Sequence, residues 1–389
     1  MRRAFAGFCW LVSLFAFVPA HAQQTVKVGL IMTYSGQFTD PAAQMDNGIK
    51  LYMKQHGDVA AGKKIEIIRR DTGGAPDAAK RLAQELIVRD NVDILAGFVI
   101  TPEALAVADL SAEAKKFMVV MNAATSIITT KSLYMTRVSL TLPQNCEPLG
   151  IWAFRNGIRK VYTVVSDYAP GHDADASFQS AFKAAGGEIV GAVRMPVTTV
   201  DFSPFVQRVK DQDPEAIFVF IPGGSQPPAL AKALIERGID PKKIKVMGQG
   251  EIAEESALAG MGDAAIGIVT AFHYDYNHQS QTNADFVKAY SAEFKRNPDY
   301  FSVGGYDGMH LVYEALKKNS GRADGEGLIA AAKGMKWESP RGPMSIDPET
   351  RDVIQTIYIR RVEKVNGQLR NVEIEKFENV KDPVKARMK

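Results

Sequence analysis

The stretch FMVVMNAATSII, residues 117–128, joins an apolar strand to small residues that can form hydrogen bonds. Residues 117–121 have the composition of a buried strand, and NAATS follows directly at 122–126. Small side chains let a ligand approach main-chain N–H groups, and free N–H groups at a helix start bind anions. The stretch therefore has two interpretations: an ordinary strand-to-helix turn with good capping residues, or a site for a small anion.

Comparable turns follow other predicted strands. Because ligands collect beyond the carboxyl ends of parallel strands, the number of these turns favours a binding edge more than any single turn does. The five segments are TYSGQFTD after Met32, GFVITPE after Leu95, SDYAPGHD after Val165, GGSQP after Pro222 and GQGE after Met247.

Short apolar strands alternate with amphipathic helices, and this alternation predicts βαβ units on parallel sheets. The pattern runs once from the start and restarts near residue 160, which predicts two α/β domains. Asn366-Gly367 predicts a hairpin turn near the end. Predicted strands are 26–32, 64–70, 93–97, 117–121, 160–166, 188–194, 215–222, 244–248 and 266–272, and predicted helices include 41–56, 75–89, 102–115, 171–185, 202–212, 225–237, 285–296 and 302–319.

Residues 1–22 have the layout of a secretory signal peptide. Arg2 and Arg3 precede an apolar run, and Ala20-His21-Ala22 has the form of a cleavage signal. We therefore expect a periplasmic protein.

The 389-residue chain has a formal net charge of only +3, which gives no electrostatic reason to expect a nucleic-acid or membrane partner. Cys146 is the one cysteine beyond the signal peptide, so packed cores must supply the stability.

Enzymatic signatures are mostly absent, so we expect no catalytic residues, cofactor or metal. GDVAAGKK, residues 57–64, nearly matches a phosphate-binding loop, but it precedes a strand and lacks the final Ser or Thr. HDADAS, residues 172–177, lacks the glycine and terminal glutamate of a calcium loop. A secreted hydrolase on a two-lobed scaffold stays open as an alternative, although no nucleophile–base pair can be proposed.

Beyond these patterns, the ordered set of segments from VKVGLIMTYSGQFTDPAAQMDNGIK through DILAGFVITPEALAVADL to FMVVMNAATS resembles the periplasmic substrate-binding proteins of ATP-driven (ABC) importers. Within them the chain is similar to the branched-chain amino acid receptors. The resemblance implies two Rossmann-like α/β lobes with parallel sheets, joined by three crossover segments near residues 142, 272 and 339. Lobe one would comprise 25–142 and 273–338, and lobe two 143–272 and 339–389. It also implies a monomer that delivers a small carboxylate to a membrane permease.

The resemblance places the ligand contacts in loops of both lobes. In the family, the small-residue turn presents main-chain N–H groups and a threonine hydroxyl to the ligand's carboxylate. The implied contacts are Phe38, Ile100, Thr101, Ala123, Ala124, Thr125, Tyr168, Gly223, Gly250, Glu251 and Phe301.

Departures from the amino acid receptors point to a different solute. Phe38 stands where the resemblance leads us to expect a tyrosine, and FVIT, residues 98–101 with Ile100, replaces a run that is rich in hydroxyl groups in those receptors. SDYAPGHDAD and MGQGEIAEESALAGMGDAAIG resemble the aromatic-acid receptors within this family. We therefore expect a benzoate-like or phenylpropenoate-like carboxylate. Apolar amino acids remain the alternative, which gains if Glu251 points into the cleft and can pair with an ammonium group.

Overall fold

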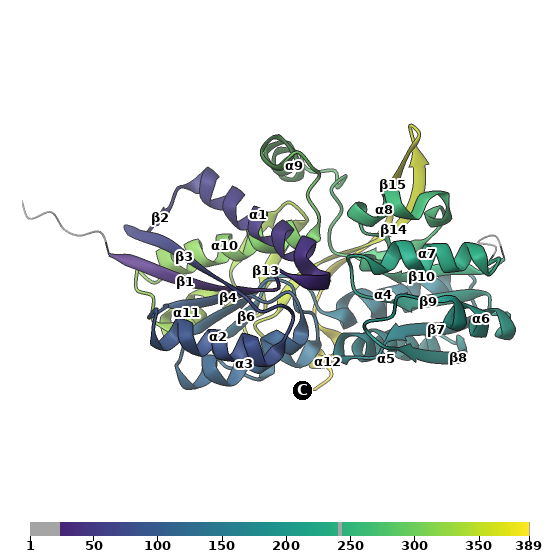
Figure 1. Cartoon of the computed structure of the whole chain (residues 1–389), viewed down its shortest axis with the longest axis horizontal. Coiled ribbons are helices and arrows are strands. Elements are labelled where there is room, and N and C mark those ends of the chain that lie inside the picture. The colour runs from purple at the N-terminus through teal and green to yellow at the C-terminus, as the bar shows by residue number, and fades with distance from the viewer. Residues whose placement is uncertain (1–23, 240–242, 389) are drawn as a thin grey trace, which may run out of the picture.

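The computed structural model describes residues 24–239 and 243–388, so the predicted signal peptide lies outside it. The chain forms two α/β lobes, each built around its own sheet (Figure 1). Within the described ranges, no helix has both the length and the apolar character needed to cross a membrane. Two lobes confirm the fold class that the strand–helix alternation and the resemblance predict.

The first lobe has a six-stranded sheet in the order β2-β3-β1-β4-β5-β6. Helices α1 and α10 pack together on one side of it, and α2 and α3 on the other (Figure 1). Its strands are β1 (Thr25–Met32), β2 (Val59–Ala60), β3 (Lys63–Asp71), β4 (Ile94–Gly97), β5 (Phe117–Val120) and β6 (Met135–Arg137), and its helices are η1 (Gly36–Phe38), α1 (Thr39–His56), α2 (Pro76–Val88), α3 (Thr101–Glu113), η2 (Ser126–Thr130), α9 (Gln281–Phe294), α10 (Tyr300–Lys318) and α11 (Gly325–Ala332).

The second sheet has nine strands. β9 is buried along its whole length, as expected for a parallel strand covered by helices on both faces. The strands are β7 (Lys160–Ser166), β8 (Glu188–Met195), β9 (Ala216–Phe220), β10 (Lys245–Gln249), β11 (Val269–Phe272), β12 (Lys336–Ser339), β13 (Gly342–Ile346), β14 (Val353–Val365) and β15 (Gln368–Val380), and the helices are α4 (Leu142–Arg155), α5 (Ala169–Ala184), α6 (Ser203–Gln212), α7 (Gln226–Glu236), η3 (Gly250–Ala253), α8 (Glu255–Met261), η4 (Gly262–Ala265) and α12 (Pro383–Ala386).

Both sheets are mixed, which corrects the prediction of parallel sheets. The parallel pairs are those of the βαβ units, but β2 runs antiparallel to β3, and β14 runs antiparallel to β11, β13 and β15. A short connection joins β2 to β3, β13 to β14 and β14 to β15, and strands that return directly through short turns run antiparallel. The predicted hairpin turn is present: β14 and β15 flank Asn366 and Gly367, whose φ angles are 51° and 80°, as a type I′ turn requires.

Buried arginines hold the segments that connect the lobes. The Arg341 guanidinium donates to the main-chain oxygens of Val138 and Ser139 and pairs with Asp307. Arg360, on β14, donates to the Tyr274 carbonyl oxygen at 2.7 Å. These charge-assisted hydrogen bonds supply donors to buried carbonyl groups of the connecting segments, and they stabilise the positions of those segments.

Candidate functional site

A cavity lies between the lobes, where loops after strands of both sheets meet. The space between its lining residues is about 360 Å³ and is partly open to solvent. Residues of both lobes line it, so the two lobes meet around this space. It is lined by Phe38, Val99, Ile100, Thr101, Asn122, Ala123, Ala124, Leu142, Tyr168, Pro170, Phe220, Pro222, Gly223, Glu251 and Phe301.

Most of the contact positions implied by the resemblance line this cavity, and two do not. The structure brings together Phe38, Ile100, Thr101, Ala123, Ala124, Tyr168, Gly223, Glu251 and Phe301.

Thr125 and Gly250 lie behind the cavity wall. The Thr125 hydroxyl bonds the Thr101 hydroxyl, with 3.0 Å between the oxygens. Gly250 packs against the Phe272 ring so closely that an added Cβ would lie 2.1 Å from Cγ of that ring. Close packing therefore explains the glycine at position 250.

Sequence reasoning missed six of the lining residues. Three of them, Val99, Asn122 and Pro222, directly precede a predicted position, so a shift of one residue would have found them. Phe220 is the most informative: it ends the apolar strand β9, and Ile221 separates it from a proline and two glycines. Such an ending is the signal that could have identified it. The missed lining residues are Val99, Asn122, Leu142, Pro170, Phe220 and Pro222.

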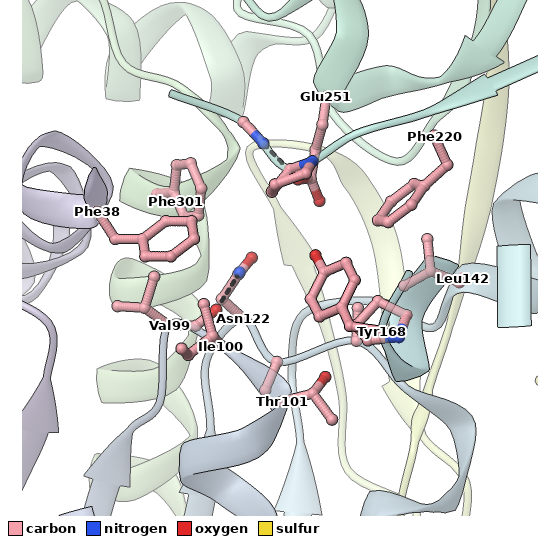
Figure 2. Close-up of a pocket in the computed structure, with 15 residues that line it drawn as sticks. Phe38, Val99, Ile100, Thr101, Asn122, Leu142, Tyr168, Phe220, Glu251 and Phe301 are labelled. Atoms are coloured by element: carbon pink, nitrogen blue, oxygen red, sulfur yellow. Dashed lines mark hydrogen bonds between the residues drawn. The ribbon is translucent and has the colours of Figure 1, made fainter. Parts of the chain in front are cut away.

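Aromatic side chains form two opposite walls of the cavity. Figure 2 shows Phe38 and Phe301 on the first lobe facing Tyr168 and Phe220 on the second. The Tyr168 and Phe220 rings are stacked, with their centroids 6.2 Å apart and their planes inclined at 25°. Such walls suit a flat apolar body, because aromatic pairs favour offset-stacked and edge-to-face contacts.

Main-chain N–H groups are free at one end of the cavity. The N–H of Ala123 donates to the Phe98 carbonyl oxygen at 3.0 Å, and that of Thr125 donates to the Thr101 hydroxyl at 3.4 Å. Within residues 24–239 and 243–388, the N–H groups of Ala124 and Thr101 have no acceptor. Thr101 begins α3, so the helix dipole also favours an anion here.

Glu251 lies at the other end of the cavity, with its carboxylate directed inward (Figure 2). Its Oε2 accepts a hydrogen bond from the Gly223 N–H at 2.7 Å. Burial raises the pKa of Glu251 to about 7, and the bonds from Gly223, Tyr300 and Gln249 offset part of this effect. The cavity therefore has donors at one end and an ionisable acceptor at the other.

Arg137, on β6, fixes the turn that carries Ala124. Its guanidinium donates to the carbonyl oxygens of Ala123 at 2.9 Å and Thr125 at 2.8 Å, and its Nε donates to Asp352 at 2.9 Å. Both charged side chains are fully buried. The turn is thus held from behind, which keeps its N–H groups directed at the cavity.

The lining residues include no Ser, Cys or His. Among the residues that the structure describes, no group of three or more His, Cys, Asp or Glu side chains could hold a metal ion. The fold and the cavity together define a two-lobed receptor that encloses a small molecule.

Comparisons with known proteins assign the chain to a family of such receptors. Residues 25–368 match the family model described as Periplasmic binding protein. The chain belongs to this family, and family membership implies a periplasmic receptor that works with a membrane permease.

Three relatives illustrate the range of solutes. An ABC-transporter solute binding protein from Rhodopseudomonas palustris BisB5, in complex with 3,4-dihydroxybenzoic acid, is 56% identical with a TM-score of 0.90, covering 93% of this chain and 99% of that one. Another, from R. palustris HaA2 with p-hydroxybenzoic acid, is 43% identical with a TM-score of 0.91, covering 94% and 100%. Leu/Ile/Val-binding protein homolog 6 from Brucella melitensis is 43% identical, covering 92% and 93%.

Proposed function

We propose that the protein is the solute receptor of an ABC importer for small aromatic carboxylates, with hydroxylated benzoates as the preferred ligands. The observation that carries this proposal is the polarity of the cavity: free N–H groups at one end, aromatic walls, and the Glu251 carboxylate at the other end. The similarity to receptors that were solved with hydroxybenzoates supports it.

The ends of the cavity suggest how the ligand lies. Its carboxylate accepts from the N–H groups of Ala124 and Thr101, because a carboxylate beside Glu251 would be repelled. A ring hydroxyl donates to Glu251, and the ring lies between the aromatic walls. Each bond between a charged group and a donor contributes roughly 1.5–3 kcal/mol, and burying the ring contributes about 2–3 kcal/mol. A para-hydroxylated benzoate places its two polar groups at opposite ends of a rigid ring, as the cavity does.

Apolar amino acids are the second candidate. The inward direction of Glu251 favours them, because a carboxylate can pair with an ammonium group, and four curated relatives carry the name Leu/Ile/Val-binding protein homolog 6. In an α-amino acid, however, the ammonium and the carboxylate share one carbon atom. Glu251 and the free N–H groups would then have to bind two groups that lie next to each other, although they are at opposite ends of the cavity (Figure 2).

A ligand panel separates the two candidates. We expect 4-hydroxybenzoate and 3,4-dihydroxybenzoate to raise the melting temperature most, benzoate and cinnamate less, and leucine and valine not at all. A free ligand concentration of 100 times the Kd stabilises the folded state by about 2.7 kcal/mol. Thermal scanning easily detects the resulting rise in melting temperature. A response to leucine without a response to any benzoate would overturn the proposal. A mass spectrum of the natively purified protein would identify a retained solute directly.

Delivery requires the lobes to open and close. We propose lobe boundaries at 25–142 with 273–338 and 143–272 with 339–389, with the protein acting as a monomer. Closure excludes water and strengthens the buried polar contacts. The closed face is then recognised by the permease, and the ligand is released with no covalent bond made or broken.

The raised pKa of Glu251 predicts a pH dependence. The ionised carboxylate is the acceptor for a ring hydroxyl, so affinity is full above the pKa of about 7 and falls as the pH drops through it. We expect 4-hydroxybenzoate to bind about tenfold more weakly at pH 6 than at pH 8, by isothermal titration calorimetry.

Two controls accompany this measurement. Glu251→Gln cannot ionise and should remove the pH dependence, and benzoate, which lacks the hydroxyl, should show none with the wild-type protein. An equal dependence in the wild type and in Glu251→Gln would show that another group is responsible.

A further inference from the structure

Ser126 directly follows the cavity turn, and three different elements bind its polar groups. Its N–H donates to Oδ2 of Asp173 at 2.7 Å, and its hydroxyl donates to Oδ2 of Asp382 at 2.6 Å. Its carbonyl oxygen accepts from Arg137 at 3.3 Å. Ser126 itself is only 5% exposed. Both carboxylates belong to the second lobe, and the bond to Asp173 is of special interest, because it connects η2 to α5, the helix that presents residues to the cavity.

The two ends of this bond lie beside the two sides of the cavity. Asp173 is on the first turns of α5, the helix that Tyr168 caps and that also presents Pro170 to the cavity. Ser126 is two residues from Ala124, whose N–H is free for a ligand. Any movement that brings Tyr168 toward the 122–126 turn therefore also brings Asp173 toward the Ser126 N–H.

We propose that Asp173 is a closure latch: its carboxylate captures the Ser126 N–H as the lobes close and retains the ligand without touching it. Asp173 is thus a positioning residue that acts through the 122–126 turn. The proposal rests on the proposed function only in requiring that a ligand be enclosed between the lobes.

The surroundings of Asp173 suit a bond made on closure. Burial raises the pKa of Asp173, and the Asp382 carboxylate acts in the same direction. The Ser126 N–H, Arg137 and His172 lower it. A carboxylate loses hydration as it is enclosed, and a hydrogen bond to the charged group offsets that loss. The Ser126 N–H is the donor that becomes available at this position.

The test compares Asp173→Ala with Asp173→Asn, with 4-hydroxybenzoate as the probe. Alanine removes the acceptor, whereas the asparagine amide oxygen can still accept from the Ser126 N–H. We expect Asp173→Ala to bind about tenfold more weakly, through faster dissociation in stopped-flow measurements, and Asp173→Asn to stay within about threefold of the wild type. The melting temperature of the ligand-free Asp173→Ala protein should match that of the wild type.

Two control variants isolate the bond. Asp167→Ala removes a more exposed carboxylate whose one side-chain hydrogen-bond partner among the described residues is His172, and it should not change dissociation. Ser126→Ala removes the bond to Asp382 but keeps the N–H, and should retain most of the affinity. Unchanged dissociation in Asp173→Ala would overturn the proposal, as would an equal loss in Asp173→Asn or a lowered melting temperature without ligand.

The probe keeps the two proposals distinguishable. If wild-type protein does not bind 4-hydroxybenzoate, the proposed ligand is wrong, and the same variants are compared with leucine as the probe. If wild-type protein binds and the variants dissociate at its rate, the latch alone is wrong.

Discussion

Gly223→Leu is expected to lower the affinity for 4-hydroxybenzoate at least about 100-fold, measured by calorimetry at pH 8. A Cβ atom at this position would lie 3.2 Å from the Tyr300 hydroxyl, and 3.7 Å from both Glu251 Oε2 and Phe301 Cε2. The rest of the leucine side chain would then occupy the space that the ligand ring needs. The loss combines the burial of the ring, about 2–3 kcal/mol, with the hydrogen bonds that require the ring in place.

The substitution should leave the folded protein intact. Gly223 does not have a positive φ angle, so a side chain is compatible with its backbone, and only the end of Tyr300 must move. Ser225→Leu is the matched control, because residue 225 is exposed on the same loop and does not line the cavity. Binding by Gly223→Leu within tenfold of the wild type would show that the solute lies elsewhere.

Arg137→Ala is expected to lower the free energy of unfolding by about 3–5 kcal/mol, measured by urea unfolding of the ligand-free protein. The substitution leaves the carbonyl oxygens of Ala123 and Thr125 without this donor, and it removes one partner of the buried Asp352 carboxylate. Lys385 also pairs with Asp352, which should keep the loss toward the lower end of this range. Ligand binding should weaken as well, because the turn would lose its support.

Arg155→Ala provides the comparison. Arg155 pairs with Glu375 at the surface at 3.2 Å, and its side chain is 59% exposed. Exposed ion pairs contribute about 0–1 kcal/mol, so this variant should unfold close to the wild-type midpoint. A similar small change in Arg137→Ala would contradict the role given to the buried guanidinium.

Local patterns in the sequence predict the elements that carry the cavity. Each of the turns after Met32, Leu95 and Val165 follows an apolar strand and precedes a helix. The change from a strand pattern to a helix pattern and the composition of the segment therefore both predict where the turn lies. Of the eleven contacts that the resemblance implies, nine, including Phe38 and Tyr168, line the cavity, because the resemblance covers the chain in order.

What the sequence does not reveal depends on partners far along the chain. Arg137 lies in a three-residue strand, and its acceptor Asp352 is 215 residues away, so no local pattern identifies the pair. The antiparallel pairing of β14 with β11 likewise joins segments about 90 residues apart. The sequence predicts Phe220 only as part of a buried strand, because the direction of a strand residue is fixed only when the sheet is packed. Helix α4 is absent from the predicted helices, because Pro148 lies in its interior and proline disfavours interior helix positions.

Cys146 lies on α4 with no exposed surface, and burial raises the pKa of its thiol well above the usual range. It is the one thiol among the residues that the structure describes. A maleimide dye should therefore not react with Cys146 in the folded protein. It should react only with a cysteine introduced at the rim of the cleft. Such a labelled protein would convert lobe movement into a fluorescence change, giving a sensor for dissolved aromatic acids that needs no other reagent.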